Sequence, residues 1–224
     1  MTVILVLATF FTFVALDWFL HRGKVPAVAS ANEPAQVSQI DRIAGFLAPI
    51  NLRYHAGHAW LQRERRNIAR AGADEFAAAL AGDISKIELP KPGQWVRQGQ
   101  KVFTLHRNGE TTEMVSPIEG EVIEVNQEVV KNPALLREDP YGRGWLMTVN
   151  VPDEESTTRN LIPKNMVRNW MRDAVERLYA MQPETAYATA ADGGEPARDL
   201  LAGMPPESHI EWQKVTQQFF LTGE

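Results

Sequence analysis

Residues 101–126 read KVFTLHRNGETTEMVSPIEGEVIEVN, and this stretch decides the fold. Asn108-Gly109 stands between two runs rich in β-branched residues, and this dipeptide is typical of a two-residue hairpin turn because both positions accept a positive φ. We therefore predict a hairpin of strands 102–107 and 110–115. A further strand is expected at 120–126, after the Ser116-Pro117 break.

Similar short runs, separated by Gly, Pro, Asn or Asp, recur from Tyr54 to Val151, and this spacing is typical of an all-β sandwich or barrel. A short helix at 74–80 interrupts them, with Asp74 as its N-cap and Gly82 just beyond its end. An amphipathic helix is expected at 163–181. The strands expected in this region are 58–62, 67–71, 84–89, 101–107, 111–116, 120–126 and 145–151.

Composition excludes several classes of function. The chain has 23 Lys and Arg against 28 Asp and Glu, a net charge of −5, so it lacks the basic surface that a nucleic-acid partner requires. It has no cysteine, which excludes disulfides, thiol nucleophiles and cysteine-bound metals. Phosphate-binding loops and Ser-His-Asp patterns are also missing from the sequence, so we predict no catalytic residues.

The N-terminus contains a long apolar run, residues 3–20, interrupted by Thr9, Thr12 and Asp17. A helix of about 20 residues crosses a bilayer core of roughly 30 Å, so we expect a transmembrane anchor at 1–22. The positive charges follow the run, which predicts a single-pass protein of the inner membrane with its β domain on the cytoplasmic side. A cleaved signal peptide is the alternative. Residues 23–45 are expected to be a linker.

The remaining chain divides into a β domain with its C-terminal helix, 46–181, and an acidic tail, 182–224. In this tail, four apolar side chains cluster on one helical face, and we predict them as partner-binding residues. The alternative, weighed equally, is that this helix folds back onto its own β domain, because a short helix has little stability alone. The four residues are Trp212, Val215, Phe219 and Phe220.

His55 and His58 form a His-x-x-His pair, to which His106 could add a third ligand. A zinc site needs three converging protein ligands, and no acidic residue stands at ligand spacing to the pair, so no metal site is predicted. The arginines between residues 63 and 70 are expected to be a solvated strand edge.

Four stretches, 54–60, 81–93, 116–126 and 132–146, resemble the H-protein family of the glycine cleavage system. The resemblance implies a mainly β barrel-sandwich hybrid of the biotinyl/lipoyl-like class, with C-terminal helices. In this family a lysine at the tip of a β-hairpin carries a lipoyl group.

Counting from the matching residues on either side places this lysine at Gly109, which cannot carry the group. Lys101 and Lys131 lie elsewhere, and the family's acidic residue before the lysine is replaced by His106-Arg107-Asn108. We therefore expect no cofactor. The sequence predicts a non-catalytic accessory or assembly subunit that binds other subunits of a bacterial membrane complex, such as a redox complex. The alternatives are a lipoyl carrier or lipoate relay that uses another lysine, and an efflux-pump adaptor.

Overall fold

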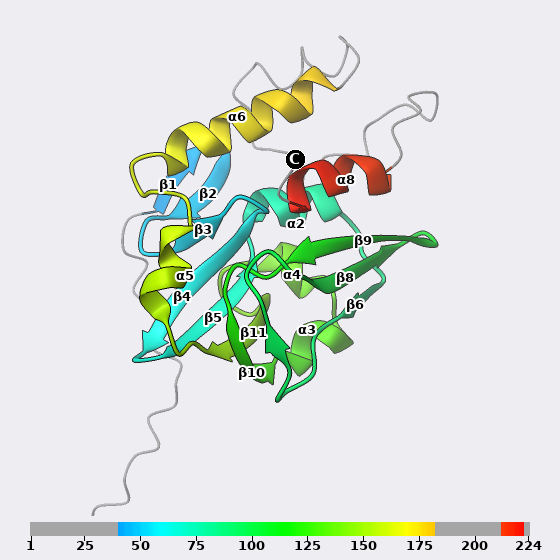
Figure 1. Cartoon of the computed structure of the whole chain (residues 1–224). Helices are drawn as coiled ribbons and strands as arrows, with labels where there is room; N and C mark the ends of the chain where they lie inside the picture. Colours follow the sequence, from blue (N-terminus) through cyan, green and yellow to red (C-terminus); the bar gives the residue numbers. More distant parts are fainter. Residues whose placement is uncertain (1–39, 182–211, 222–224) are drawn as a thin grey trace, which may run out of the picture. The chain divides into compact units, whose positions relative to one another are not determined.

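The computed structural model describes residues 40–181 and 212–221, and these residues form a mainly β structure with helices around it (Figure 1). The strands are β1 (Ile40–Ile43), β2 (Phe46–Pro49), β3 (Arg53–His55), β4 (Ala59–Arg65), β5 (Ile68–Ala73), β6 (Lys86–Glu88), β7 (Trp95–Val96), β8 (Lys101–Arg107), β9 (Glu110–Val115), β10 (Gly120–Val125) and β11 (Trp145–Asn150). The helices are α2 (Glu75–Ala81), α3 (Gln127–Lys131), α4 (Leu135–Glu138), α5 (Glu154–Arg159), α6 (Val167–Ala180) and α8 (Trp212–Phe220).

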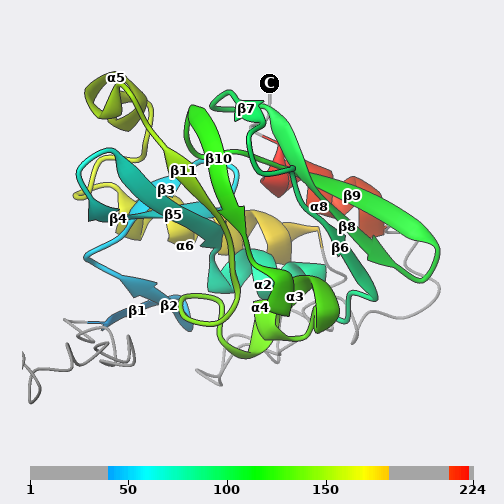
Figure 2. The same cartoon turned by 90° about the horizontal axis from the view of Figure 1, so that it is seen from below.

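The described strands make a six-stranded antiparallel sheet in the order β3-β4-β5-β11-β10-β7, a three-stranded sheet β6-β8-β9, and the separate β1-β2 hairpin (Figure 2). In β8, buried Phe103 and Leu105 alternate with partly exposed neighbours, because successive side chains of a strand point to opposite faces. The core is continuous and includes Trp60, Phe76 and Phe103. This arrangement is consistent with the barrel-sandwich hybrid that the resemblance implies.

The predicted hairpin is confirmed. β8 pairs with β9 up to Arg107 opposite Glu110, and the two turn residues, Asn108 and Gly109, have φ angles of 50° and 85°. Both positions therefore need the left-handed conformation that an Asn-Gly pair adopts most easily.

The predicted short helix is confirmed as α2. The carboxylate of Asp74 accepts a hydrogen bond from the backbone N–H of Ala77 at 2.7 Å, and Gly82, with φ 68°, ends the helix. Such a cap satisfies a backbone donor that has no partner inside the helix.

The fold differs from the expectation in several places, among them the short strands β2, β3 and β7, which were not predicted. β1 lies within the segment 23–45 that was expected to be a linker; tertiary contacts hold the β1-β2 hairpin, among them hydrogen bonds of Leu47 to Glu75 and Tyr141. The helices α3, α4 and α5 are short and carry no extended apolar period, so they were not predicted. The α6 helix begins at Val167 rather than at Pro163.

The predicted transmembrane anchor, 1–22, lies outside the described residues, as does most of the acidic tail. Within 40–181 and 212–221, no helix has the length and apolar character needed to cross a bilayer.

Candidate functional site

The tip of the β8-β9 hairpin is the candidate site, because the resemblance places the modified lysine there. Gly109 occupies that position, and a Cβ atom built on it would meet no other atom within 4 Å. In Figures 1 and 2 the tip projects beyond the strands that flank it. The geometry thus presents an open turn of the expected kind, but the turn has no amine.

The lysines of β6 and β8 do not supply this amine. Lys86 on β6 lies opposite His106 of β8, and its Nζ atom is 2.6 Å from Oε1 of Glu88. Glu88 lies farther from the tip than Lys86 does, because it pairs with Thr104. Lys101 lies at the other end of β8, with its Nζ atom 2.9 Å from Oε2 of Glu113. Both side chains are therefore held away from the turn.

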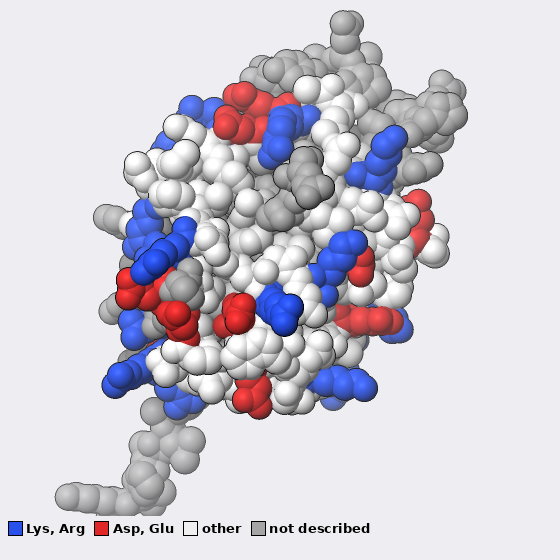
Figure 3. Space-filling view, in the orientation of Figure 1, with Lys and Arg blue, Asp and Glu red and all other residues white. Residues whose placement is uncertain are grey.

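The strand that leads to the turn carries basic side chains. His106 Nε2 lies 3.2 Å from Oε1 of Glu88, and the hydrogen bond and positive charge of Lys86 lower the pKa of that carboxyl group. Arg107 donates a hydrogen bond to the carbonyl of Ala81 at 3.2 Å and lies over the ring of Trp212. Around this strand, one face of the molecule carries interspersed basic and acidic groups rather than a basic patch (Figure 3).

The predicted partner-binding residues Trp212, Val215, Phe219 and Phe220 are all buried in the domain. The indole N–H of Trp212 donates to the carbonyl of Ala81 at 3.2 Å, and the Phe219 ring packs edge-on against Phe76 at 5.2 Å. Of the two alternatives weighed for this helix, the structure shows the fold-back one: α8 packs on its own domain, because a helix this short is stable only when it packs on something. A partner for α8 stays a prediction.

Gly57 explains how α8 approaches so closely. A Cβ atom at this position would lie 2.7 Å from the carbonyl oxygen of Phe220 and 2.7 Å from Cγ2 of Val115, which is far inside contact distance. Only glycine therefore fits between α8 and β9 at this turn. This glycine, between two buried histidines, is the sequence feature from which the packing of α8 could have been suspected.

The histidine pair is structural. His58 is fully buried, its Nδ1 atom lies 2.9 Å from Oδ2 of Asp74, and its ring stacks on Trp170 at 4.5 Å. His55 Nδ1 accepts a hydrogen bond from the backbone N–H of Gly57, and burial lowers its pKa to about 4. Across the described part of the chain, no three potential ligands converge on a metal position.

Several relatives of this chain are described as H proteins of the glycine cleavage system. The chain is 34% identical over 119 residues to the "Glycine cleavage system H protein" of Carboxydothermus hydrogenoformans. This alignment covers 53% of this chain and 91% of that protein. The H protein of Thermobifida fusca is 39% identical over 106 residues, 47% of this chain and 83% of that protein. A crystal structure of an H protein from Mycobacterium marinum aligns with a TM-score of 0.44 and 28% identity, over 47% of this chain and 87% of that chain.

These findings correct the predicted localisation. The relatives that match this chain are glycine cleavage H proteins by name, which contradicts the assignment to the inner membrane. The prediction depended only on the apolar run and on the positive charges that follow it. Such a run of about 20 residues satisfies the length criterion for a spanning helix without any tertiary information.

The family model described as "Glycine cleavage H-protein" matches residues 52–174, which is more than half of the chain. The match extends from just before β3 to the middle of α6 and includes the hairpin whose tip is Gly109. The chain therefore belongs to the glycine cleavage H-protein family.

Proposed function

We propose that this protein is an H-protein-like binding module without a lipoyl group, which acts as an accessory subunit by contacting proteins of the glycine cleavage system. Gly109 at the hairpin tip is the observation that carries the proposal. Attachment of a lipoyl group needs a primary amine that projects from an exposed turn, and glycine has no side chain. The family fold around the tip is retained, which favours a role in recognition.

The neighbouring side chains support the same reading. His106 and Arg107 stand on the strand before the turn, and each is engaged with the domain, His106 beside Glu88 and Arg107 on Ala81. The hairpin therefore ends in an exposed, mainly polar turn, which a partner protein can contact directly. Such a module would act by binding rather than by catalysis.

The first test is the mass of the intact protein. The full chain is produced together with a lipoate ligase and lipoate, with the Thermobifida fusca H protein as the positive control. We expect the mass of the bare polypeptide for this chain and an added lipoyl group for the control. A lipoyl adduct on the unmodified sequence would overturn the proposal.

Gly109→Lys provides a sharper version of this test, because it restores the amine at the same place. The turn should be strained by about 1 kcal/mol, since a side chain at φ 85° is unfavourable. Modification of this variant, but not of the original chain, would show that the missing amine alone prevents lipoylation. If Gly109→Lys is folded and stays unmodified, His106→Glu is added, because the basic flank would then be the second obstacle.

The second candidate is a lipoyl carrier that uses a different lysine, and membership of the H-protein family favours it. Lys86 is the lysine nearest the tip in the described strands, opposite His106. If an adduct is found, peptide mapping and the variant Lys86→Arg locate it, with Lys101→Arg as the matched control. Loss of the adduct in Lys86→Arg alone would place the lipoyl group on Lys86 and favour this carrier function over the binding module.

Binding is tested by competition. The purified chain is added to the other components of a glycine cleavage system, and the rate is measured with a fixed amount of lipoylated H protein. We expect the chain to inhibit at a concentration comparable to that of the H protein, because it would occupy the same partner surface. An unchanged rate at a large excess of the chain would contradict the proposed partner.

A further inference from the structure

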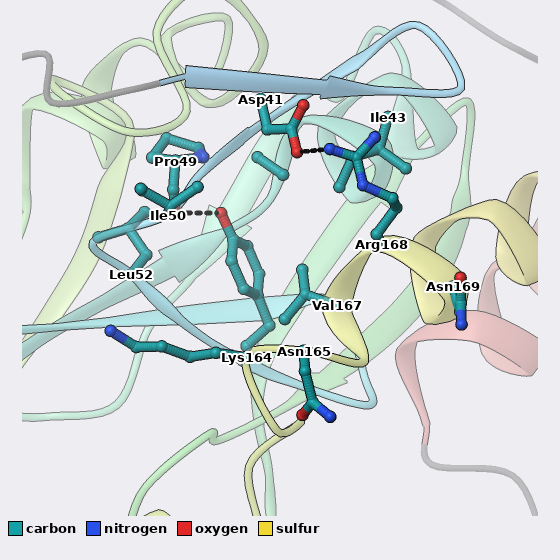
Figure 4. Close-up of a pocket in the computed structure, with 12 residues that line it drawn as sticks. Asp41, Ile43, Pro49, Ile50, Leu52, Lys164, Asn165, Val167, Arg168 and Asn169 are labelled. Carbon is teal, nitrogen blue, oxygen red and sulfur yellow. Dashed lines mark hydrogen bonds and ion pairs between the residues drawn. The ribbon is translucent and has the colours of Figure 1, made fainter.

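A pocket of about 430 Å³ lies between the β1-β2 hairpin and the start of α6 (Figure 4). Its volume is within the range of small-ligand sites, roughly 300–1,000 Å³. Both Figures 1 and 2 place this region far from the tip of the β8-β9 hairpin. One wall comes from residues 41–50, which precede the part matched by the family model, 52–174.

The interior of the pocket is apolar. Ile43, Ala48 and Leu52 are buried, and Val167 faces them from the first turn of α6. The Tyr54 hydroxyl donates to the carbonyl of Pro49 at 3.1 Å, and burial raises the pKa of this tyrosine, so its hydroxyl is neutral and already hydrogen-bonded. The interior can therefore contact the apolar part of a ligand, and the residues named here add no charged group to it.

Apolar surface continues to the rim. The side chain of Ile50 lines the pocket and is 47% exposed, and Met166, beside Asn165 and Val167, is 54% exposed. Both belong to the small set of large apolar side chains that remain exposed among the described residues. Exposed apolar groups beside a cavity are typical of a binding site, whereas single scattered ones are ordinary.

The mouth carries an excess of positive charge. Arg168 forms an ion pair with Asp41 across the gap between α6 and β1, so these two charges cancel. Lys164 lines the same mouth and forms no ion pair or hydrogen bond with the described residues. One positive charge is therefore left for a ligand.

We propose that this pocket binds a small carboxylate with an apolar body. The body lies against Ile43, Leu52 and Val167, and the carboxylate group lies at the mouth, beside Lys164. The site is separate from the hairpin tip, and its occupation does not depend on whether the chain is lipoylated.

The probe is 4-phenylbutyrate, compared with its neutral amide and with 4-phenylbutylamine, which share its body. Each is titrated into the methyl-labelled full chain and followed by NMR. We expect the carboxylate to shift the methyl resonances of Ile43, Ile50, Leu52 and Val167 with a Kd in the millimolar range, as is ordinary for a ligand with so few heavy atoms. The amide should bind about twofold to fivefold more weakly, which is the size of an exposed charge pair, and the amine more weakly still.

Two variants with matched controls locate the site. Lys164→Gln should reduce the affinity for the carboxylate to that for the amide and leave the amide unaffected, whereas Lys131→Gln, an exposed lysine on α3, should change neither. Ile50→Asp should weaken carboxylate binding about tenfold by combining repulsion with lost apolar contact. Ile123→Asp, at a position that is equally exposed at 46%, should not. Equal binding of all three probes, shifts confined to other methyl groups, or no binding at all would overturn the proposal.

Discussion

The hydroxyl groups of Thr112 on β9 and Thr216 on α8 lie 2.7 Å apart and form a buried hydrogen bond. This bond joins the last described helix to the strand that returns from the hairpin tip. Thr216 also bonds to the carbonyl of Trp212 within α8. The C-terminal helix is therefore part of the domain, although residues 182–211 separate it from α6 in sequence.

Trp212→Ala should destabilise the domain by about 3–5 kcal/mol, because it removes a buried aromatic side chain together with its hydrogen bond to Ala81. Urea denaturation measures the change. Gln213→Ala, at the exposed neighbouring position, is the control and should stay within about 0.5 kcal/mol of the original protein. Equal stability of the two variants would mean that α8 contributes nothing to the domain.

Gly72→Ala should lower the free energy of unfolding by about 1–3 kcal/mol, because the added methyl group overpacks the core. A Cβ atom there would lie 2.6 Å from Cζ2 of Trp60, whose indole N–H is fixed by a 3.0 Å hydrogen bond to the carbonyl of Pro140. Gly109→Ala is the comparison, because it adds only backbone strain at φ 85°, worth about 1 kcal/mol, in open space. Thermal unfolding of both proteins tests this order, and a Gly72→Ala protein as stable as the original would refute it.

Asp74→Ala should lower the free energy of unfolding of the domain by about 3–5 kcal/mol. It removes the cap of α2 and leaves the buried Nδ1 of His58 without its partner, and both losses occur out of contact with water. Asp83→Ala, whose side chain is 76% exposed and paired with Arg137, should cost less than about 1 kcal/mol. Chemical denaturation of the two proteins distinguishes a buried network from an ordinary surface carboxylate.

Stability should fall in mild acid because of His55. Burial lowers its pKa in the folded state to about 4, below the usual 6.5, so folding favours the neutral ring. The contribution is complete above pH 6.5 and is lost as the pH falls towards 4, up to about 3 kcal/mol at 1.36 kcal/mol per pKa unit.

His55→Asn keeps an acceptor for the N–H of Gly57 and removes the titrating ring. Its free energy of unfolding, measured at several values between pH 7 and pH 4, should change less than that of the original protein. His106→Gln, at a partly exposed position, serves as the control and should retain the original slope. An identical slope for His55→Asn would show that another group causes the acid sensitivity.

The local features of the fold could be predicted because their causes are local. Asn108-Gly109 determines its own turn, and Asp74 and Gly82 mark the two ends of α2 through backbone geometry that neighbouring residues do not change. The assignment of Gly109 to the family's lysine position also needed only local information, because it came from counting residues between the matching stretches on either side. These inferences needed no knowledge of distant contacts.

What could not be predicted depends on contacts between distant residues. β1 and β2 are short, and the Tyr141 hydroxyl, far along the chain, donates to the carbonyl of Leu47 in that hairpin. The apolar face of α8 is the same whether it meets a partner or its own domain, and only the position of Phe76 and Gly57 beneath it distinguishes the two. The pocket beside α6 likewise needs three separate segments to meet.

The position of α8 far beyond its packing partners in sequence also has a consequence for biosynthesis. Translation proceeds from the N-terminus, so the rings of Phe76 and His58 are made long before Phe219, which packs against both of them. Until α8 leaves the ribosome, the nascent domain exposes this apolar surface, and contacts of such large sequence separation slow folding. Production of residues 1–224, rather than of the matched region 52–174 alone, should therefore give the higher yield of folded protein.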